Sequence, residues 1–175
     1  DAESVLICST GVIGVPIPMT TLLAGLAPLV EALDDAGGHA AANAILTTDL
    51  VDKQVALELE LELELEGRRV RIGGMAKGSG MIHPDMATML GFFSCDAGVD
   101  ASVWQGMVQR AVQRSFNAIT VDGDTSTNDT VLAFAAGPSL AEEHHAVLEQ
   151  GLTQAMQQLA PVSYTHLTLP TRRFV

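Results

Sequence analysis

The stretch QVALELELELELE, Gln54 to Glu66, alternates leucine with glutamate over most of its length. Successive side chains of a β-strand point to opposite faces, so the alternation predicts a strand with one buried face and one solvated face. A turn at Gly67–Arg68 then predicts that the chain returns through Val70–Ile72, which makes a hairpin. The glutamates are interpreted as a solvated strand face, and nothing in the repeat carries chemistry.

Upstream of this hairpin, Met19–Asp35 carries leucine and valine residues at helical spacing, which predicts an amphipathic helix. Thr20 or Thr21 is the expected N-cap, and Gly37–Gly38 is the expected stop. Pro28 weakens the prediction in the middle, because a proline inside a helix removes one hydrogen bond and crowds the preceding turn.

Downstream, Met89–Cys95 is short and almost wholly apolar, so we expect a strand covered on both faces. Helices are expected over Ser102–Phe116 and Ala141–Leu159, the second with a capping box formed by Ser139 and Glu142. The chain is therefore expected to have a mixed α/β (α+β) fold in which helices pack on sheet layers.

The composition is that of a globular protein with an aliphatic core. The 175 residues are 47% hydrophobic and 4% aromatic, which suits one domain. A net charge of −12 with only nine Lys and Arg argues against a nucleic-acid partner. Cys8 and Cys95 lack CxxC spacing, which favours reduced thiols. No apolar run reaches the length of a membrane span, so we expect a cytoplasmic protein with no membrane partner.

The polar loops match neither a nucleotide site nor a metal site. In GGMAKGSGMIHPDMATML, Gly73 to Leu90, Lys77 precedes Gly78, which is the wrong order for a P-loop. VDGDTSTNDT, Val121 to Thr130, lacks the glycine and the glutamate that an EF-hand requires at its sixth and twelfth positions. We interpret it as a turn whose side chains hydrogen-bond their own backbone. The histidines lack ligand spacing, so no metal is expected.

The dipeptide Ala87–Thr88 suggests a different chemistry. A threonine hydroxyl is a poor nucleophile, but the α-amine freed by cleavage before it can act as its base. Such an amine titrates near ~8, so a useful fraction is neutral at pH 7. The glycine-rich approach lets the backbone bend for attack on the Ala87 carbonyl. The stretch predicts a self-made threonine nucleophile, with a plain loop as the alternative.

Four motifs in order resemble the ornithine acetyltransferase family, over Val5–Pro161. They are CSTGVIG (Cys8–Gly14), TTD (Thr47–Asp49), GGMAKGSGMIHPDMATML (Gly73–Leu90) and FNAITVDGDTSTNDT (Phe116–Thr130). The resemblance implies layered sheets between helices, similar to the N-terminal-nucleophile hydrolases but distinct in topology. It also implies a precursor that cleaves itself between Ala87 and Thr88 into α and β chains, which assemble as an α2β2 heterotetramer.

The resemblance further implies transfer of an acetyl group from N-acetylornithine to glutamate in arginine biosynthesis, through an acetyl ester on Thr88. Acetyl-CoA would be an alternative donor in bifunctional members, and no bound cofactor is expected. Thr10 and Gly11 would form the oxyanion hole, which acyl transfer requires. Thr47, Lys77 and Thr88 would contact the substrate.

The resemblance also bears on how much of the protein is present. Residues 1–87 would be the end of the α chain and residues 88–161 the start of the β chain, so we expect this piece alone to be inactive. Residues 162–175 contain VSYTHLTLPT, which resembles a translated sequencing adapter, and are expected to be a non-native tail; the alternative is an ordinary polar tail. Leu50 stands where the family usually has threonine, but Thr47 is retained.

Two other functions stay open at this point. One is an N-terminal-nucleophile aminopeptidase or amidase, in which water accepts the acyl group in place of glutamate. The other is a noncatalytic domain whose glycine-rich loop holds a nucleotide.

Overall fold

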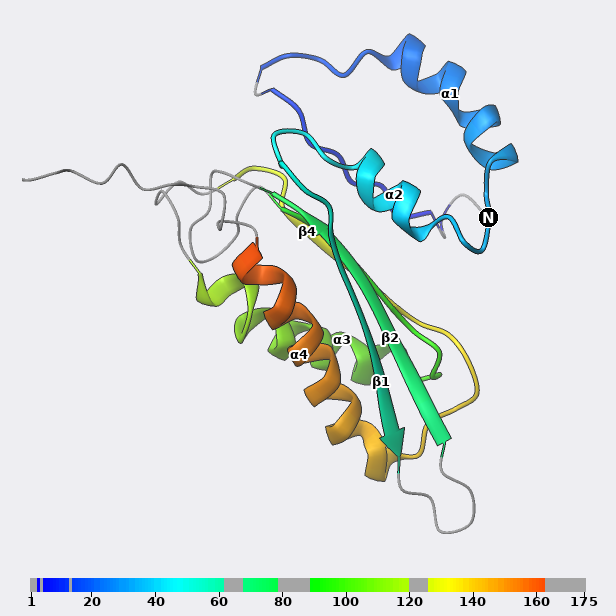
Figure 1. Cartoon of the computed structure of the whole chain (residues 1–175), viewed down its shortest axis with the longest axis vertical. Helices are drawn as coiled ribbons and strands as arrows, with labels where there is room; N and C mark the ends of the chain where they lie inside the picture. The colour runs from blue at the N-terminus through cyan, green and yellow to red at the C-terminus, as the bar shows by residue number, and fades with distance from the viewer. Residues whose placement is uncertain are drawn as a thin grey trace, which may run out of the picture.

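A four-stranded sheet forms the centre of the chain (Figure 1). The computed structural model describes residues 3, 5–12, 14–61, 68–78, 89–119 and 126–162. The strands are β1 (Lys53–Leu61), β2 (Arg68–Lys77), β3 (Leu90–Cys95) and β4 (Thr130–Ala135), in that spatial order. The first three pair antiparallel, whereas β4 pairs parallel with β3. The predicted mixed α/β fold is confirmed.

The β1–β2 hairpin follows the alternation in the sequence. The leucines of β1 point toward the helix layer, while Glu58 and Glu60 are exposed on the other face. Arg69 and Arg71 of β2 make ion pairs with these glutamates at 2.9 to 3.2 Å. The predicted hairpin is confirmed, although residues 62–67, which include Gly67 of the predicted turn, lie outside the described residues.

Helices α3 (Ala101–Gln113) and α4 (His145–Val162) cover one face of the sheet (Figure 1). A Cβ atom added at Gly151 would lie 2.6 Å from Leu59 Cδ1, so the glycine lets α4 approach β1 closely. The fully buried side chains of this layer are aliphatic or contain sulfur; they include Met107, Leu148, Leu152 and Met156.

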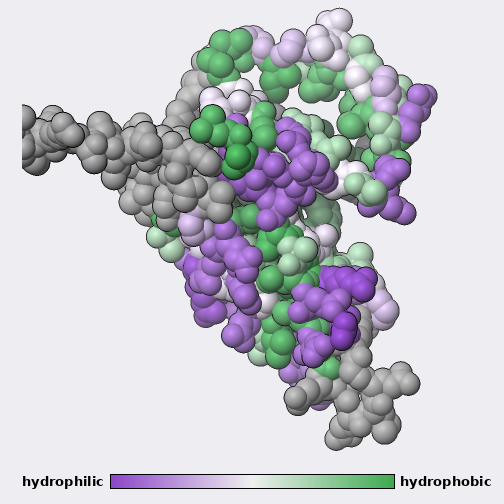
Figure 2. Space-filling view, viewed as in Figure 1, coloured by the Kyte–Doolittle hydropathy of each residue, from purple (hydrophilic) through white to green (hydrophobic). Residues whose placement is uncertain are grey.

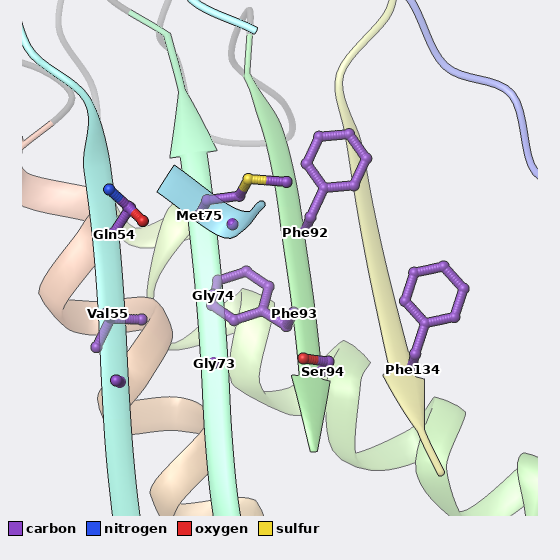
Figure 3. Close-up of a pocket in the computed structure, with 11 residues that line it drawn as sticks. Gln54, Val55, Gly73, Gly74, Met75, Phe92, Phe93, Ser94 and Phe134 are labelled. Atoms are coloured by element: carbon purple, nitrogen blue, oxygen red, sulfur yellow. The ribbon is translucent and has the colours of Figure 1, made fainter. Parts of the chain in front are cut away.

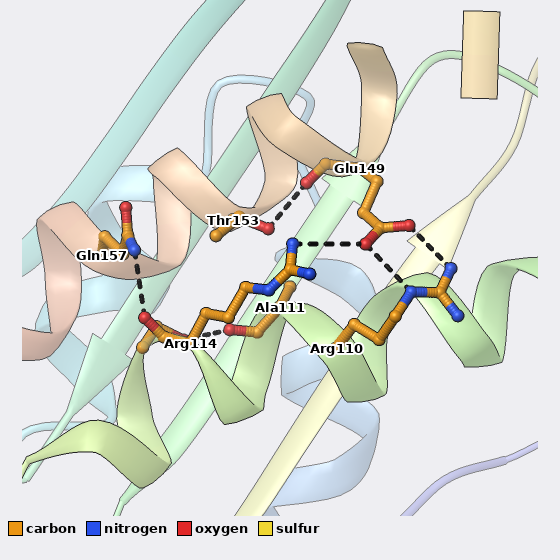
Figure 4. Close-up of polar contacts among 7 residues, drawn as sticks. Arg110, Ala111, Arg114, Glu149, Thr153 and Gln157 are labelled. Carbon is orange, nitrogen blue, oxygen red and sulfur yellow. Dashed lines mark hydrogen bonds and ion pairs between the residues drawn. The ribbon is translucent and has the colours of Figure 1, made fainter. Parts of the chain in front are cut away.

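Side chains also join the two helices to each other at the surface (Figure 4). The Arg110 guanidinium donates to both carboxylate oxygens of Glu149, at 2.9 and 2.6 Å. One turn beyond Arg110 on α3, the Arg114 carbonyl oxygen accepts a hydrogen bond from the Gln157 side-chain amide at 3.0 Å. Arg110 is half exposed, so these contacts orient the helices more than they stabilise them.

The ends of α3 and α4 differ from the sequence predictions. The Asp100 carboxylate caps α3 by accepting the Ser102 N–H at 2.9 Å. The helix ends at Gln113, and Phe116–Ala118 forms a separate 3₁₀ turn. The predicted capping box of α4 is wrong, because a 3₁₀ turn at Glu142–His144 precedes the helix and begins without a side-chain cap.

The N-terminal part holds two helices, of which one was predicted. Helix α1 (Met19–Glu31) begins after Pro18 with no side-chain cap, so neither threonine has the predicted role, and it continues through Pro28. Helix α2 (Gly38–Ala44) was missed, because Gly37–Gly38 was interpreted as a stop, whereas Gly37 is its N-cap. None of the described helices has the length and apolarity that crossing a membrane requires.

The apolar face of α1 lies at the surface. The helix contains no buried residue, and Leu26, Leu29 and Val30 are about half exposed or more. Figure 2 shows hydrophobic side chains at the surface of this N-terminal region. The helical periodicity was therefore predicted correctly, but among the described residues nothing buries the face that it creates.

Strands β3 and β4 also differ from expectation. In β3, Phe93 is buried under the helices, whereas Ser94 on the opposite face is exposed, so the prediction of two covered faces is wrong for the described residues. Strand β4 was not predicted. It is attached to the helix layer by the Trp104 indole N–H, which donates to the Ala133 carbonyl oxygen at 2.9 Å.

A core truncation tests the packing of α4. Leu152→Ala removes a fully buried side chain and leaves a cavity, so the free energy of unfolding should fall by about 2–5 kcal/mol. Gln150→Ala, on the exposed side of the same helix, should change it by less than about 0.5 kcal/mol. Urea unfolding followed by circular dichroism measures both, and equal effects would contradict this packing.

Candidate functional site

Four strand ends meet at one end of the sheet, which we call the site end. Strands β1, β3 and β4 begin there and β2 ends there, as the pairs Lys53↔Ala76, Lys77↔Leu90 and Leu90↔Thr130 show. The connection between β2 and β3 therefore starts and finishes at neighbouring positions. Residues 79–88, which include Ala87 and Thr88, lie outside the described residues.

A buried ion pair holds the main chain on the β2 side of this connection. The Asp49 carboxylate accepts the Gly78 N–H at 2.8 Å, and the Lys53 ammonium donates to the Gly78 carbonyl oxygen at 2.7 Å. Lys53 also donates to Asp49, and both side chains are fully buried. We call Asp49 and Lys53 the Gly78 clamp. Because it holds the N–H and the C=O of one residue, it fixes where β2 ends.

The clamp suits the backbone and charge at this position. Gly78 has a φ of +147°, a conformation that residues with a side chain rarely adopt. Burial alone would raise the pKa of Asp49, but hydrogen bonds from Lys53, Gly78 and the Thr47 backbone hold this pKa below its usual value. Asp49 is therefore a buried carboxylate that its partners keep ionised.

Lys77 precedes the clamp and is the last residue of β2. It is 1% exposed, which excludes a solvated loop lysine. Burial lowers the pKa of its ammonium group, while the charges of Asp49 and Asp129 oppose that change. Lys77 is thus a buried lysine at the site end whose ammonium group is favoured by the charges of both carboxylates.

A second carboxylate holds the main chain on the β3 side. Asp129 Oδ1 accepts the Met89 N–H at 2.6 Å, and the Thr130 N–H donates to the Met89 carbonyl oxygen at 3.0 Å. Met89 is the residue after Thr88, so adjacent residues at the start of β4 fix the chain immediately beyond the predicted cleavage position. Asp129 is 8% exposed, and its Oδ2 has no hydrogen-bond partner among the described residues.

Asp129 is electrostatically different from Asp49. Burial raises the pKa of Asp129 to about 6, although the Met89 N–H, the Ser126 side chain and the charge of Lys77 all favour its ionised form. Asp49 has an ammonium group in direct contact, whereas Lys77 acts on Asp129 only through its charge. The site end thus holds one well-compensated carboxylate and one that is poorly compensated.

The predicted oxyanion residues lie beside the same loop. The Asn128 side-chain amide donates to the Ser9 carbonyl oxygen at 2.5 Å, across 119 positions of sequence. Thr10 and Gly11 follow Ser9 and line a cavity of about 190 Å³ together with Thr127 and Asn128. Since Asp129 comes next in the chain, the cavity is close in sequence to the residue that holds Met89.

Thr47 is exposed and lies two residues before Asp49. Thr47 is thus near the Gly78 clamp through Asp49 and Lys77 directly precedes Gly78, whereas Thr10 and Gly11 lie with Asn128 around one cavity. The structure describes no contact between these two groups. Within the described residues, no three His, Cys, Asp or Glu side chains lie close enough to hold a metal ion.

Sequence reasoning missed three residues of this site: Asp49, Lys53 and Asp129. The two aspartates stood inside motifs that had been singled out, but they had not been given roles. The predicted local turn is confirmed for Ser126, whose side-chain oxygen accepts the Asn128 N–H at 3.4 Å. It is wrong for Asp129, which accepts a main-chain N–H 40 residues away.

A larger groove, of about 580 Å³, lies on the open face of the sheet (Figure 3). Phe92 and Phe134 project from β3 and β4 on this face, beside Met75 of β2. The described residues that line the groove include no acid, lysine, arginine or histidine. The groove therefore provides apolar surface, and the groups able to do acid–base chemistry are at the site end.

Comparison with known proteins identifies the family to which these motifs belong. The ArgJ family profile matches residues 1–163. The chain belongs to the ArgJ family. The arginine biosynthesis bifunctional protein ArgJ of Parasynechococcus marenigrum (strain WH8102) is 79% identical over 160 residues, which are 91% of this chain and 38% of that protein.

Other ArgJ relatives match the same part. The bifunctional protein ArgJ of Prochlorococcus marinus (strain MIT 9313) is 72% identical over 158 residues, 90% of this chain and 36% of that protein. The Thermosynechococcus vestitus protein of the same name is 58% identical over 164 residues, 90% of this chain and 38% of that protein. The ArgJ-family chain thus spans less than two fifths of the length of these relatives.

Breaking the Gly78 clamp on one side should be strongly destabilising. Lys53→Met leaves Asp49 buried without its cation, so the free energy of unfolding should fall by about 3–5 kcal/mol. The double change Asp49→Asn with Lys53→Met should recover part of that loss. Arg69→Met breaks exposed pairs and should cost less than about 1 kcal/mol. Urea unfolding compares the variants, and a Lys53→Met effect as small as that of Arg69→Met would refute the clamp.

The raised pKa of Asp129 should make stability depend on pH. The folded protein binds this proton more tightly than the unfolded chain, so the contribution is complete below about pH 4 and is lost as the pH rises through about 6. A pKa of about 6 against 3.8 corresponds to about 3 kcal/mol. The unfolding free energy of wild type minus that of Asp129→Asn should therefore decrease by up to this amount between pH 4 and pH 7. A difference independent of pH would contradict the assignment.

Proposed function

We propose that this ArgJ-family sequence is part of an acyltransferase of arginine biosynthesis that moves the acetyl group of N2-acetylornithine to glutamate. The name of its relatives, arginine biosynthesis bifunctional protein, and the family match support this proposal. The observation that carries it is the arrangement at the site end. Buried side chains hold Gly78 and Met89, the main-chain positions on either side of residues 79–88.

In this proposal the protein first makes its own nucleophile. The Thr88 hydroxyl oxygen attacks the Ala87 carbonyl carbon, the Ala87–Thr88 C–N bond breaks, and the acyl group passes to oxygen as an ester. Water then hydrolyses the ester, which leaves a carboxylate on Ala87 and a free α-amine on Thr88. That amine is the base for the neighbouring hydroxyl in the next reaction.

The transfer reaction uses the same oxygen twice. Thr88 Oγ attacks the acetyl carbonyl carbon of N2-acetylornithine, its proton passes to the departing amine, and ornithine leaves. The amine of glutamate then attacks the acetyl ester, and N-acetylglutamate leaves with Thr88 restored. The two half-reactions share one covalent intermediate, so ping-pong kinetics follow.

Thr10 and Gly11 would stabilise the oxyanion of each half-reaction. Donors for that charge must be held rigidly before the reaction to be effective. The hydrogen bond from Asn128 to the Ser9 carbonyl oxygen supports this role, because it fastens the segment to the loop that carries Asp129. The cavity that Thr10 and Gly11 line provides room beside these groups.

Lys77 and Thr47 would bind the substrate. An ammonium group in a water-poor site attracts a carboxylate more strongly than one in bulk water, and Lys77 is buried. The Gly78 clamp supports the role of Lys77, because it fixes the main chain next to it. Thr47 is exposed and its backbone is tied to Asp49, so its side chain is available to a ligand.

The whole protein would act in the cytoplasm as an α2β2 assembly of its two cleaved chains. Acetyl-CoA would serve as an alternative donor, and no bound cofactor is needed. The chain alone would be inactive, because it covers less than two fifths of its relatives.

Substitution of the nucleophile tests the proposal. In a full-length ArgJ-family protein that contains this sequence, Thr88→Ala should leave a single uncut chain and abolish acetyl transfer, because the attacking oxygen is gone. Thr88→Ser keeps a hydroxyl and should still be cut. Denaturing electrophoresis reads the cleavage. After digestion of enzyme trapped with labelled N-acetylornithine, the label should lie on the peptide that begins with Thr88.

Acceptor dependence separates transfer from hydrolysis. Ornithine release by the cleaved wild-type protein should require glutamate. Equal release without glutamate would identify an amidase instead, and a wild-type chain that stays intact would overturn the processing step.

A further inference from the structure

We propose that Asp129 is a positioning residue for the nucleophile: its carboxylate orients the peptide group that joins Thr88 to β3. This inference rests on the proposed role of Thr88 and goes beyond it, because it assigns a function to a residue outside the expected site. The observation is the 2.6 Å hydrogen bond from the Met89 N–H to Asp129 Oδ1.

Covalent geometry explains why a bond to Met89 acts on its neighbour. The six atoms from one Cα through the peptide group to the next Cα lie close to one plane. The plane that contains the Met89 N–H therefore also contains the Cα of residue 88. With that plane fixed, only the torsions within residue 88 itself separate it from the hydroxyl oxygen.

The hold on Met89 is two-sided. Asp129 accepts its N–H, and the next residue, Thr130, donates to its carbonyl oxygen at 3.0 Å. The main-chain bond from Thr130 belongs to the parallel ladder between β3 and β4 and would form with any side chain at position 129. The bond that the Asp129 carboxylate accepts is the additional constraint, and it acts on the N–H of the peptide group shared with residue 88.

A carboxylate at position 129 lowers the stability of the fold at neutral pH. The Oδ2 of Asp129, like that of Asp49, is buried with no hydrogen-bond partner among the described residues, and Lys77 on β2 favours its ionised form only through its charge. An asparagine can accept the same N–H with a neutral oxygen and would avoid burying a charge. A hydrogen bond to an ionised acceptor is about twice as strong as one between neutral groups, so aspartate holds the N–H more firmly.

At position 129, aspartate therefore holds the Met89 N–H more rigidly, whereas asparagine gives the higher free energy of unfolding at neutral pH. If Asp129 served only the fold, the rate of self-cleavage would follow stability across variants. If it positions the nucleophile, the rate of self-cleavage should not follow the free energy of unfolding across the variants. A variant that is as stable as wild type but slower to cleave would show this difference.

The experiment uses a full-length ArgJ-family protein that contains this sequence, at pH 7. Asp129→Ala should slow self-cleavage and acetyl transfer by at least about tenfold, because no acceptor remains for the Met89 N–H. Asp129→Asn should give intermediate rates although its unfolding free energy is at least that of wild type. Electrophoresis over time gives the cleavage rate, and the transfer rate is measured per molecule of cleaved protein.

A matched control removes another bond between a side chain and the main chain of the sheet. Trp104→Phe deletes the hydrogen bond to the Ala133 carbonyl oxygen and should lower stability, yet leave both rates within about twofold of wild type. Asp129→Ala at the wild-type rate, or Asp129→Asn at least as fast as wild type, would overturn the positioning role while Thr88→Ala still blocks cleavage. Cleavage of Thr88→Ala would instead overturn the proposed function, and this inference with it.

Discussion

Hydrogen bonds between buried charged side chains and the main chain at Gly78 and Met89 are the interactions on which the site end depends. A charge away from water persists only where partners replace its hydration. Asp49 has such partners in Lys53 and two backbone N–H groups, whereas Asp129 has one backbone N–H, the Ser126 side chain and an ammonium that acts only through its charge. The end of β2 is therefore held by an ion pair whose charges offset each other. The start of β3 is held by a buried carboxylate whose charge is only partly offset.

The helix layer supplies the rigidity that these bonds require. Close packing of α4 on β1 and β2, with Gly151 against Leu59, fixes the strands along their length. The polar groups then need only set the positions where strands begin and end. The apolar core lies between the sheet and the helices, and the charged side chains lie at the site end. Substitutions in the core can therefore be studied separately from substitutions of the charged residues.

Local patterns in the sequence were enough for the elements whose side chains alternate or repeat. Leucine and glutamate predicted β1, and apolar spacing predicted α1, α3 and α4. Helix α2 was missed because adjacent glycines usually end helices, and here Gly37 begins one. Lys53 has a local partner in Asp49, four residues away, but the residue that the two hold together, Gly78, is 25 residues from Lys53, so the sequence does not show that the pair is buried. The same holds for Asp129, whose contact with Met89 exists only once β3 and β4 have paired.

The family motifs singled out the segments of the candidate site, but not all of the residues that hold them. Thr10, Thr47 and Lys77 were chosen by resemblance, and the structure places each beside a charged or amide side chain that fastens the backbone. The sequence did not identify those supporting residues, because their role depends on which main-chain groups they contact in the folded protein. A carboxylate in a loop looks the same in sequence whether it faces water or a peptide N–H.

The pairing of β2 with β3 determines what a break between residues 87 and 88 leaves behind. The two strands share six register pairs from Ile72↔Cys95 to Lys77↔Leu90, so the resulting polypeptides would remain joined through one intermolecular sheet. Folding of the intact precursor is a first-order process. Once cut and denatured, the pieces would have to find each other in a second-order encounter, so renaturation would become dependent on concentration.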